Sequence, residues 1–411
     1  MTQRIIAIGF IFASTAVAWT ILGATVKVRT HEQDTKLRSA VGQLWGSAQK
    51  QQAPTAYWTE REIVGTENGQ AVQRAIEKKH SIPLQSSRID VDLQLDHRRK
   101  GLLWYATYGV TFASAYTVAN ETNQVREVFF DFALPDPKAA YDDFKVAIDG
   151  DPVVGARIVS GHLQQPIQLL PGQRRSIHIS YTSQGLDEWW YSFGEDVNQV
   201  SDFTLAMQTN FEAIDFPQNS MSPTTKQQAT NDWQLEWRYD SLLTGVDVGM
   251  AMPDKLNPGP WTSQVSFAAP ISLFLFFFLL FVFTTIKNIK IHPMNYFFVG
   301  AAFFSFHLLL AYLVDHLSIH LAFFICSAVS IFLVISYMRL VVGLRLALVE
   351  LGLAQFIYLV LFSYTFFFEG YTGLAITLLC IATLFAAMQF TGRVDWETVF
   401  RQDRSSETPA T

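Results

Sequence analysis

Cysteine is almost absent from the sequence. Only Cys326 and Cys380 occur in 411 residues, and both lie inside long apolar runs. Residues 27–266 contain none, so this polar segment can form neither a disulfide nor a cysteine-ligated metal site. Exported domains without cysteine are common, so the absence is compatible with export.

Recognised catalytic signatures are also missing. The sequence contains no G-x-S-x-G elbow, no P-loop, no H-E-x-x-H motif and no dinucleotide-binding fingerprint. The formal net charge of −6 is modest and argues against a nucleic-acid partner. We therefore expect no enzymatic activity, no cofactor and no nucleic-acid binding.

Long apolar runs are present instead, and most of the 34 Phe residues lie in the last third of the chain. Each run is near the roughly 20 residues that an α-helix needs to cross a bilayer. The six runs are Ile5–Val26, Ala268–Ile286, Tyr296–Leu313, Leu321–Met338, Leu351–Phe368 and Gly373–Phe390. The sequence therefore predicts an integral membrane protein whose main partner is the lipid bilayer.

These runs divide the chain into four parts. We expect an N-terminal transmembrane anchor at 1–26, an exported β-rich domain at 27–266, a five-helix transmembrane bundle at 267–396 and a disordered cytoplasmic tail at 397–411. The fold class is α + β: a six-helix bundle with a large β-rich domain inserted between the first and second spans.

The first run has two interpretations. Arg4 followed by an apolar stretch resembles a signal peptide, with a candidate cleavage site at residues 16–18. The apolar stretch continues to Val26, which is long enough to span, so we favour an uncleaved anchor.

Lysine and arginine in the short joints predict the orientation. Basic residues follow the second, fourth and sixth spans, whereas the joints at 315–318 and 369–371 contain neither Lys nor Arg. Cytoplasmic loops carry the excess of Lys and Arg. Both termini are therefore expected in the cytoplasm, and the β-rich domain outside it.

Two periodicities occur in the polar segment. Residues 30–50 have helical spacing of apolar side chains, and Pro54 ends the pattern. From Arg88 the period is two, as in Ile89, Val91 and Leu93 between acidic residues. Repeated alternation with turn signals predicts an antiparallel, sandwich-like domain.

Four ionisable residues cluster near the outer ends of the spans: Asp315, His316, His320 and Glu369. Such groups could ligate Zn²⁺ or relay protons, or they could simply mark where the lipid ends. His307 and Glu350 lie within or beside apolar runs, where an ionisable group usually faces the bundle interior. Glu350 could pair with Arg345, and His307 could bond a neighbouring helix.

An aromatic cluster in the exported segment is a candidate ligand contact. Trp189 and Trp190 are adjacent, and adjacent strand residues point to opposite faces. At least one is therefore expected to be exposed, where it could bind sugar, peptide or lipid headgroups, or pack on the membrane surface.

Several motifs together resemble the CreD family of bacterial inner-membrane proteins. They are His292–Tyr296, Asp315-His316, Tyr337–Arg339, Thr391–Trp396, Arg98–Gly101 and the segment around Trp45-Gly46. The chain has Ala53-Pro54 where the family usually has Gly-Pro. The resemblance implies an inner-membrane protein linked with envelope integrity and stress response.

Three functions remain open. The first is a non-enzymatic protein with a structural or regulatory role in the envelope, in contact with other envelope proteins. The second is a small transporter or proton-coupled channel that uses His307 and the outer cluster. The third is a sensor that binds an unidentified small molecule in a concave pocket near Trp189.

Overall fold

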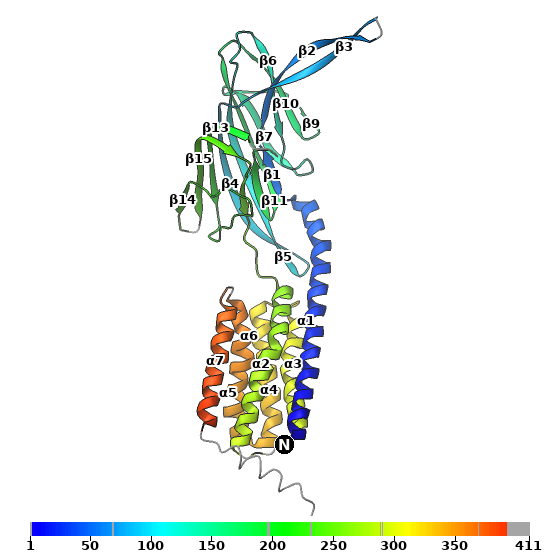
Figure 1. Cartoon of the computed structure of the whole chain (residues 1–411), viewed down its shortest axis with the longest axis vertical. Coiled ribbons are helices and arrows are strands. Elements are labelled where there is room, and N and C mark those ends of the chain that lie inside the picture. The colour runs from blue at the N-terminus through cyan, green and yellow to red at the C-terminus, as the bar shows by residue number, and fades with distance from the viewer. Residues whose placement is uncertain are drawn as a thin grey trace, which may run out of the picture. The chain divides into compact units, whose positions relative to one another are not determined.

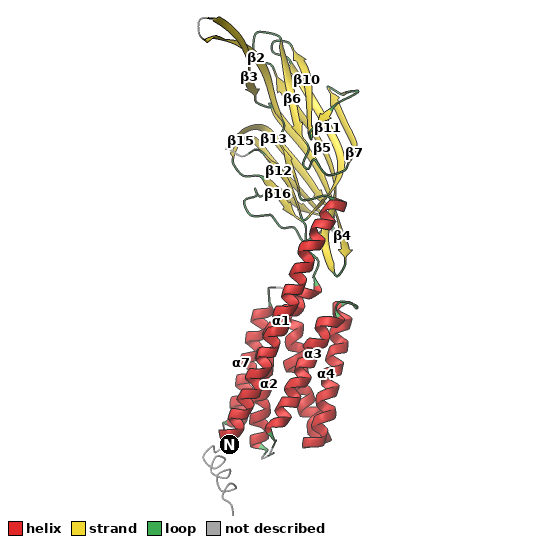
Figure 2. Cartoon of the chain, turned by 90° about the vertical axis from the view of Figure 1, so that its right-hand side faces the viewer, coloured by secondary structure: helices red, strands yellow, loops and turns green. Residues whose placement is uncertain are grey.

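The computed structural model describes residues 2–67, 70–194, 198–230, 232–287, 289, 291–368 and 370–392, with the backbone alone at 2, 61–67 and 70–77. The chain forms two compact units, one of Met1–Thr35 with Leu256–Thr411 and one of Lys36–Lys255. Helices build the first unit and strands the second (Figures 1 and 2). The two units are separated by how their residues pack. The domain limits predicted from the sequence, at residues 26 and 266, instead mark where the chain was expected to leave and re-enter the membrane. The tail predicted at 397–411 lies outside the described residues.

Helix α1 runs without a break from Thr2 to Trp45. The sequence predicted a span ending at Val26 and a separate helix from about residue 30, and this separation is wrong. No proline or glycine pair interrupts residues 26–36, so nothing stops the helix there. It ends at Gly46, whose φ of +96° suits glycine and whose N–H donates to the carbonyl of Gly42 at 2.9 Å.

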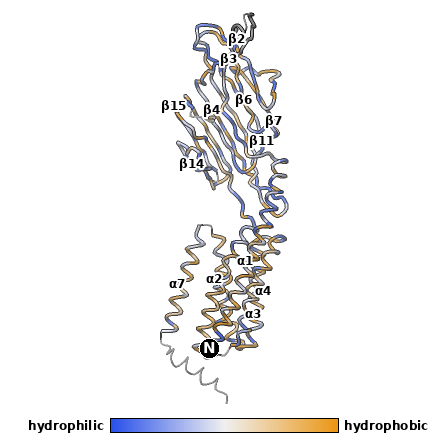
Figure 3. The backbone as a smooth tube through the Cα atoms, turned by 45° about the vertical axis from the view of Figure 1, so that its right-hand side comes forward, coloured by the Kyte–Doolittle hydropathy of each residue, from blue (hydrophilic) through white to orange (hydrophobic). Residues whose placement is uncertain are grey.

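Six helical segments are long and apolar enough to cross a membrane in the described part of the chain. The six predicted spans are therefore confirmed as apolar helices, and Figure 3 shows their hydrophobic colouring. After α1 they are α2 (Pro258–Ile286), α3 (Pro293–Leu313), α4 (Ile319–Val342), a composite fifth segment (Leu346–Phe367) and α7 (Thr372–Thr391).

The fifth segment departs from regular α-helix. It consists of η1 (Leu346–Leu351), α5 (Gly352–Gln355), η2 (Phe356–Leu361), α6 (Phe362–Tyr364) and η3 (Thr365–Phe367), of which η1 and η2 are π-helical. A π-turn displaces backbone carbonyls from their usual partners. The hydroxyl of Ser272 on α2 donates to the Tyr358 carbonyl in η2. The Tyr358 hydroxyl bonds Thr383 of α7 at 2.7 Å, which ties the segment to both neighbours.

The second unit contains three β-sheets, ordered β1-β12-β16, β3-β2-β6-β10-β9 and β14-β15-β13-β4-β5-β11-β7-β8. The first strands are β1 (Gln49–Gln52), β2 (Thr55–Glu67), β3 (Gln70–Ile82), β4 (Ser86–Lys100), β5 (Leu103–Ala119), β6 (Arg126–Ala133), β7 (Tyr141–Ile148) and β8 (Asp151–Pro152). The others are β9 (Ile158–Val159), β10 (His162–Leu169), β11 (Arg174–Leu186), β12 (Glu188–Ser192), β13 (Asn198–Thr209), β14 (Thr225–Gln228), β15 (Trp233–Thr244) and β16 (Val248–Ala251).

Alternation along the strands produces the core. Ile89, Val91 and Leu93 of β4 are 1%, 3% and 0% exposed, while Asp90 between them is exposed. The expected β-rich, mainly antiparallel domain is confirmed. Two strand pairs differ, because β1–β12 and β4–β13 are parallel. Such pairs join distant parts of the chain and leave no hairpin signal in the sequence.

Strand β10 was not among the predicted strands, and it contains Pro166. Proline cannot donate to a ladder and is confined to edges or strand ends. In this sheet β10 pairs with β6 along its whole length, but with β9 only at His162 and Leu163. Pro166 therefore lies where one side of the strand has no partner.

Buried tyrosines stabilise the sheet unit as neutral hydrogen-bonding groups. The hydroxyl of Tyr108 donates to the Glu188 carbonyl at 2.7 Å and lies 3.3 Å from the backbone N of Gln49, which donates to it. Burial raises the pKa of Tyr108 well above its ordinary value, and burial raises the pKa of Tyr116 to about 12. Both phenols therefore stay protonated over the physiological pH range.

Gly185 leaves room for the Tyr108 ring, and its replacement by alanine should destabilise the sheet unit. A Cβ at residue 185 would lie 2.3 Å from the Tyr108 hydroxyl. We expect Gly185→Ala to lower the free energy of unfolding by about 1–3 kcal/mol, because this core must shift to admit a methyl group. Thermal unfolding followed by tryptophan fluorescence measures the change. Gly109→Ala is the matched control, since its Cβ would meet nothing within 4 Å. Equal effects of the two substitutions would contradict the packing argument.

Candidate functional site

His307 lies on α3 and is 1% exposed. Its Nδ1 is 3.2 Å from the Phe303 carbonyl one turn earlier, and its Nε2 is buried without a hydrogen-bond partner among the described residues. The ring meets Trp19 of α1 edge to face, with centroids 5.4 Å apart. The expected bond to a neighbouring helix is therefore wrong: His307 contacts that helix through its ring, because the nearest carbonyl belongs to α3 itself.

Asp315 pairs with Arg29 of α1 instead of the adjacent histidine. The Arg29 Nη2 atom lies 3.3 Å from the Asp315 carboxylate and 3.1 Å from the Ala311 carbonyl. The guanidinium also lies over the Tyr312 ring, 5.6 Å from its centroid. Sequence reasoning missed this pair, because the two residues are 286 positions apart and only the packing of α1 on α3 joins them.

The predicted outer cluster does not form a metal site in the described part of the chain. His316 and His320 are exposed, and His320 stacks on Phe367 with centroids 4.6 Å apart. Among the described residues no group of three His, Cys, Asp or Glu side chains could hold a metal. Glu369 lies outside those residues. A zinc site and a proton relay would each need several of these side chains close together, and the described residues do not provide such a group.

Glu350 pairs across two spans. The Lys287 Nζ at the end of α2 lies 3.1 Å from the Glu350 Oε1 in η1. Among the described residues the ion pair of Glu350 is therefore with Lys287 and not with Arg345, as suggested from the sequence. An interhelical ion pair of this kind holds two spans together at their ends.

Gln355 is a fully buried polar residue that the sequence reasoning overlooked. Its Nε2 donates to the Ser330 hydroxyl of α4 at 3.0 Å, and this hydroxyl donates to the Ala302 carbonyl of α3 at 2.7 Å. The chain of bonds connects three spans. A lone glutamine inside an apolar run would have been the available signal, since it must find a partner in the bundle.

Neither tryptophan of the aromatic pair is exposed. Trp189 is 0% exposed, and Trp190 is half-buried with its Nε1 donating to Glu188 at 2.9 Å. The expected exposure is wrong because Trp189 packs in the hydrophobic core of the sheet unit and the Trp190 ring lies close over Gly249 of β16, where a Cβ would be 2.7 Å away. These residues support the core and do not present a ligand surface.

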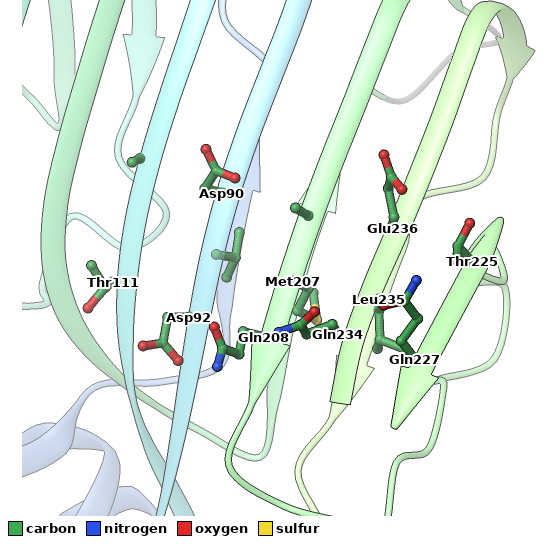
Figure 4. A pocket seen from close by; sticks show the side chains of 13 residues that line it. Asp90, Asp92, Thr111, Met207, Gln208, Thr225, Gln227, Gln234, Leu235 and Glu236 are labelled. Carbon is green, nitrogen blue, oxygen red and sulfur yellow. The ribbon is translucent and has the colours of Figure 1, made fainter. Parts of the chain in front are cut away.

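A polar pocket lies elsewhere, on the outer face of the eight-stranded sheet (Figure 4). Two rows of paired residues cross five strands, β5, β4, β13, β15 and β14. The first row is Ala113, Asp90, Ala206, Glu236 and Thr225, and the second is Thr111, Asp92, Gln208, Gln234 and Gln227. Residues paired across strands point to the same face, so both rows line one surface.

Small residues create the hollow in this sheet pocket. Ala113 and Ala206 are short, and the longer side chains beside them enclose about 370 Å³. Asp90, Asp92 and Glu236 supply carboxylates, and glutamines and threonines supply amides and hydroxyls. No Lys or Arg belongs to the described lining. The pocket could therefore accept hydrogen bonds from a small molecule that carries hydroxyl or amine groups.

Part of the helical unit is similar to a known family. Residues 266–397 match the family model described as inner membrane protein CreD. Over this region, about a third of the chain, the protein is similar to the CreD family. The matched region contains His307, Asp315, Glu350 and Gln355. The sheet pocket and the two tryptophans precede it. The motifs from His292 onward thus resembled the right family.

Comparison with other proteins adds little beyond the CreD match. No curated protein matches the chain. A candidate nutrient binding protein from Legionella pneumophila is 9% identical over 56% of this chain and 76% of its own, with a TM-score of 0.33. An M1 zinc metallopeptidase from Deinococcus radiodurans is 10% identical over 41% of this chain and 42% of its own, with a TM-score of 0.25. At these TM-scores neither likeness bears on the fold or the activity.

The environment of His307 predicts that the packing of its ring contributes more to stability than the hydrogen bonds of its nitrogens. We expect His307→Phe to keep or raise the thermal midpoint, because it retains the contact with Trp19 and removes a buried nitrogen without a partner. His307→Ala should lower the midpoint by several degrees through the cavity that it leaves. Purified protein in detergent can be compared by fluorescence-detected thermal unfolding. Loss of folded protein in His307→Phe at normal expression would instead indicate a role for the imidazole nitrogens.

Proposed function

We propose that this CreD-family protein has a structural or regulatory role in the cell envelope and no catalytic activity. The observation that carries the proposal is the local pairing of the buried polar groups in the bundle. Gln355 with Ser330, Tyr358 with Thr383 and Lys287 with Glu350 each join neighbouring spans. Polar groups arranged in this way stabilise helix contacts.

The same arrangement gives less support to proton-coupled transport. A relay needs ionisable groups in sequence along the pathway. His307 is surrounded by the rings of Trp19 and Phe306, and its Nδ1 is engaged by its own helix. The pair of Arg29 and Asp315 lies beyond the end of α3, separated from His307 by two helical turns.

We further propose that both termini lie in the cytoplasm and that the β-rich unit lies in the periplasm. The proposal rests on the Lys and Arg residues that follow the second, fourth and sixth spans. Periplasmic placement also agrees with the absence of cysteine from residues 27–266.

Reporter fusions test this orientation. A fusion of alkaline phosphatase after Val110 should be active, because that enzyme folds only outside the cytoplasm, and a fusion after Lys287 should be inactive. A fluorescent protein that matures in the cytoplasm provides the reciprocal readout at the same two positions. The opposite pattern would reverse the proposed orientation.

A second candidate function is ligand sensing by the sheet unit, which the sheet pocket favours. The pocket combines carboxylates, amides and hydroxyls around Ala113 and Ala206. Hydrogen-bonding groups of this kind fit an amino sugar, which offers several hydroxyls and one positive charge. A sensor would use this face of the sheet in place of the tryptophans first considered.

Filling the pocket tests the sensing candidate. We expect glucosamine to bind the purified full chain in isothermal titration, and Ala206→Phe to abolish the heat signal by occupying the hollow. Thr204→Phe is the matched control, because Thr204 lies two residues earlier on the same strand and face but outside the pocket. Binding that survives Ala206→Phe, or no binding in the parent chain, would count against this ligand and this pocket.

A further inference from the structure

Arg4, near the start of α1, has two guanidinium nitrogens without a hydrogen-bond partner in the described part of the chain. The Nε and Nη2 atoms of Arg4 are buried and have no hydrogen-bond acceptor among the described residues. The guanidinium carbon lies 5.9 Å from the centroid of the Phe281 ring on α2. A guanidinium is always charged, and leaving its donors unsatisfied away from water is costly. Its position therefore calls for an acceptor supplied from outside the chain.

An apolar groove between α1 and α2 begins beside this arginine. The groove encloses about 250 Å³ and is lined by Ile5, Ile8, Gly9, Phe12, Phe274, Phe277, Phe278 and Phe281. Arg4, Ile8 and Phe12 are spaced four residues apart, so they follow one another along one face of α1. Phe281 lines the groove at the Arg4 end, and Phe12 meets Phe274 farther along, with ring centroids 5.9 Å apart. A cation thus stands at one end of a hydrocarbon-lined channel.

Gly9 lines this groove and has open space beside it. A Cβ at residue 9 would meet no atom within 4 Å, so the glycine is not required by close packing of the two helices. A larger side chain there would extend into the groove without displacing the protein. This space is suited to a flexible chain that follows the helices.

We propose that the groove between α1 and α2 binds phosphatidylglycerol, with the lipid phosphate on Arg4 and one acyl chain lying over Gly9. Guanidinium and phosphate match in geometry and form charge-assisted hydrogen bonds. Arginine near the end of a span extends its charged group toward the headgroups, which is the depth of a lipid phosphate. The all-apolar lining matches the acyl chain.

Charge distinguishes phosphatidylglycerol from a zwitterionic lipid at this site. No acidic side chain is among the described residues that line the groove, so these residues offer one positive charge to a headgroup with one negative charge. Phosphatidylethanolamine would bring an ammonium that finds no carboxylate there. A second apolar groove, between α2, the fifth segment and α7, contains both Lys287 and Glu350 at 3.1 Å, so its charges cancel.

Native mass spectrometry of the purified full chain tests the proposal with two probes, phosphatidylglycerol and phosphatidylethanolamine of identical acyl chains. We expect the parent chain to retain phosphatidylglycerol in preference. Arg4→Gln should weaken that binding roughly tenfold, the worth of a charge-assisted hydrogen bond, and Arg4→Lys should weaken it less. Gly9→Leu should reduce lipid retention by filling the groove, and Gly9→Ala should change it little.

Two controls separate this site from general lipid contact. Lys287→Gln removes a cation at the neutral groove and should leave phosphatidylglycerol binding unchanged. Arg4→Lys preserves the positive charge that orients the first span, and size-exclusion chromatography checks that each variant is folded. Equal retention of the two lipids by the parent chain would overturn the proposal. Full phosphatidylglycerol binding by folded Gly9→Leu would overturn it as well.

Discussion

Hydrocarbon offers no hydrogen-bond partners, so polar groups on the six spans are stabilised where a neighbouring helix supplies one. The fifth segment shows how strongly this constraint acts. Its π-helical turns displace carbonyls, and the Ser272 hydroxyl compensates by donating to the Tyr358 carbonyl. Gln355 is held in the same way by Ser330. The packing of the bundle follows from these bonds as much as from the fit of its phenylalanines.

This constraint also limits what the bundle can do. Side chains that bond a neighbouring helix are committed to that contact and cannot easily serve a moving ion. His307 is enclosed by aromatic rings, and the charged pairs Arg29–Asp315 and Lys287–Glu350 lie at the ends of spans. An envelope protein that supports or regulates others is consistent with such a bundle. The sheet unit, by contrast, has carboxylates, amides and hydroxyls together in the sheet pocket.

The sequence predicted those parts of the structure that depend on local pattern. The six spans follow from run length and hydropathy, and β4 follows from the alternation of Ile89, Val91 and Leu93 with acidic residues. The sheet pocket could not be predicted, because its two rows arise from the register of five strands. The burial of Trp189 likewise depends on which side chains of other strands pack over it in the core, which the alternation of residues does not reveal. The sequence analysis used Arg4 only as the positive charge before the first apolar run. The lack of a partner for its Nε and Nη2 atoms can be seen only in the structure.

The parallel pairing of β4 with β13 has a consequence for how the sheet unit folds. These strands are neighbours inside the eight-stranded sheet, yet paired residues such as Ile89 and Leu205 are far apart in the sequence. Strand β13 can pair with β4 only after the strands between them in the sequence have been synthesised. Bringing two such distant strands together costs loop-closure entropy, and contacts of this kind are associated with slow folding. Until β13 arrives, the open edge of β4 could pair with another chain. The exposed Asp90 and the half-buried Asp92 place charge on that strand, and charged side chains on an open edge strand disfavour its pairing with another chain.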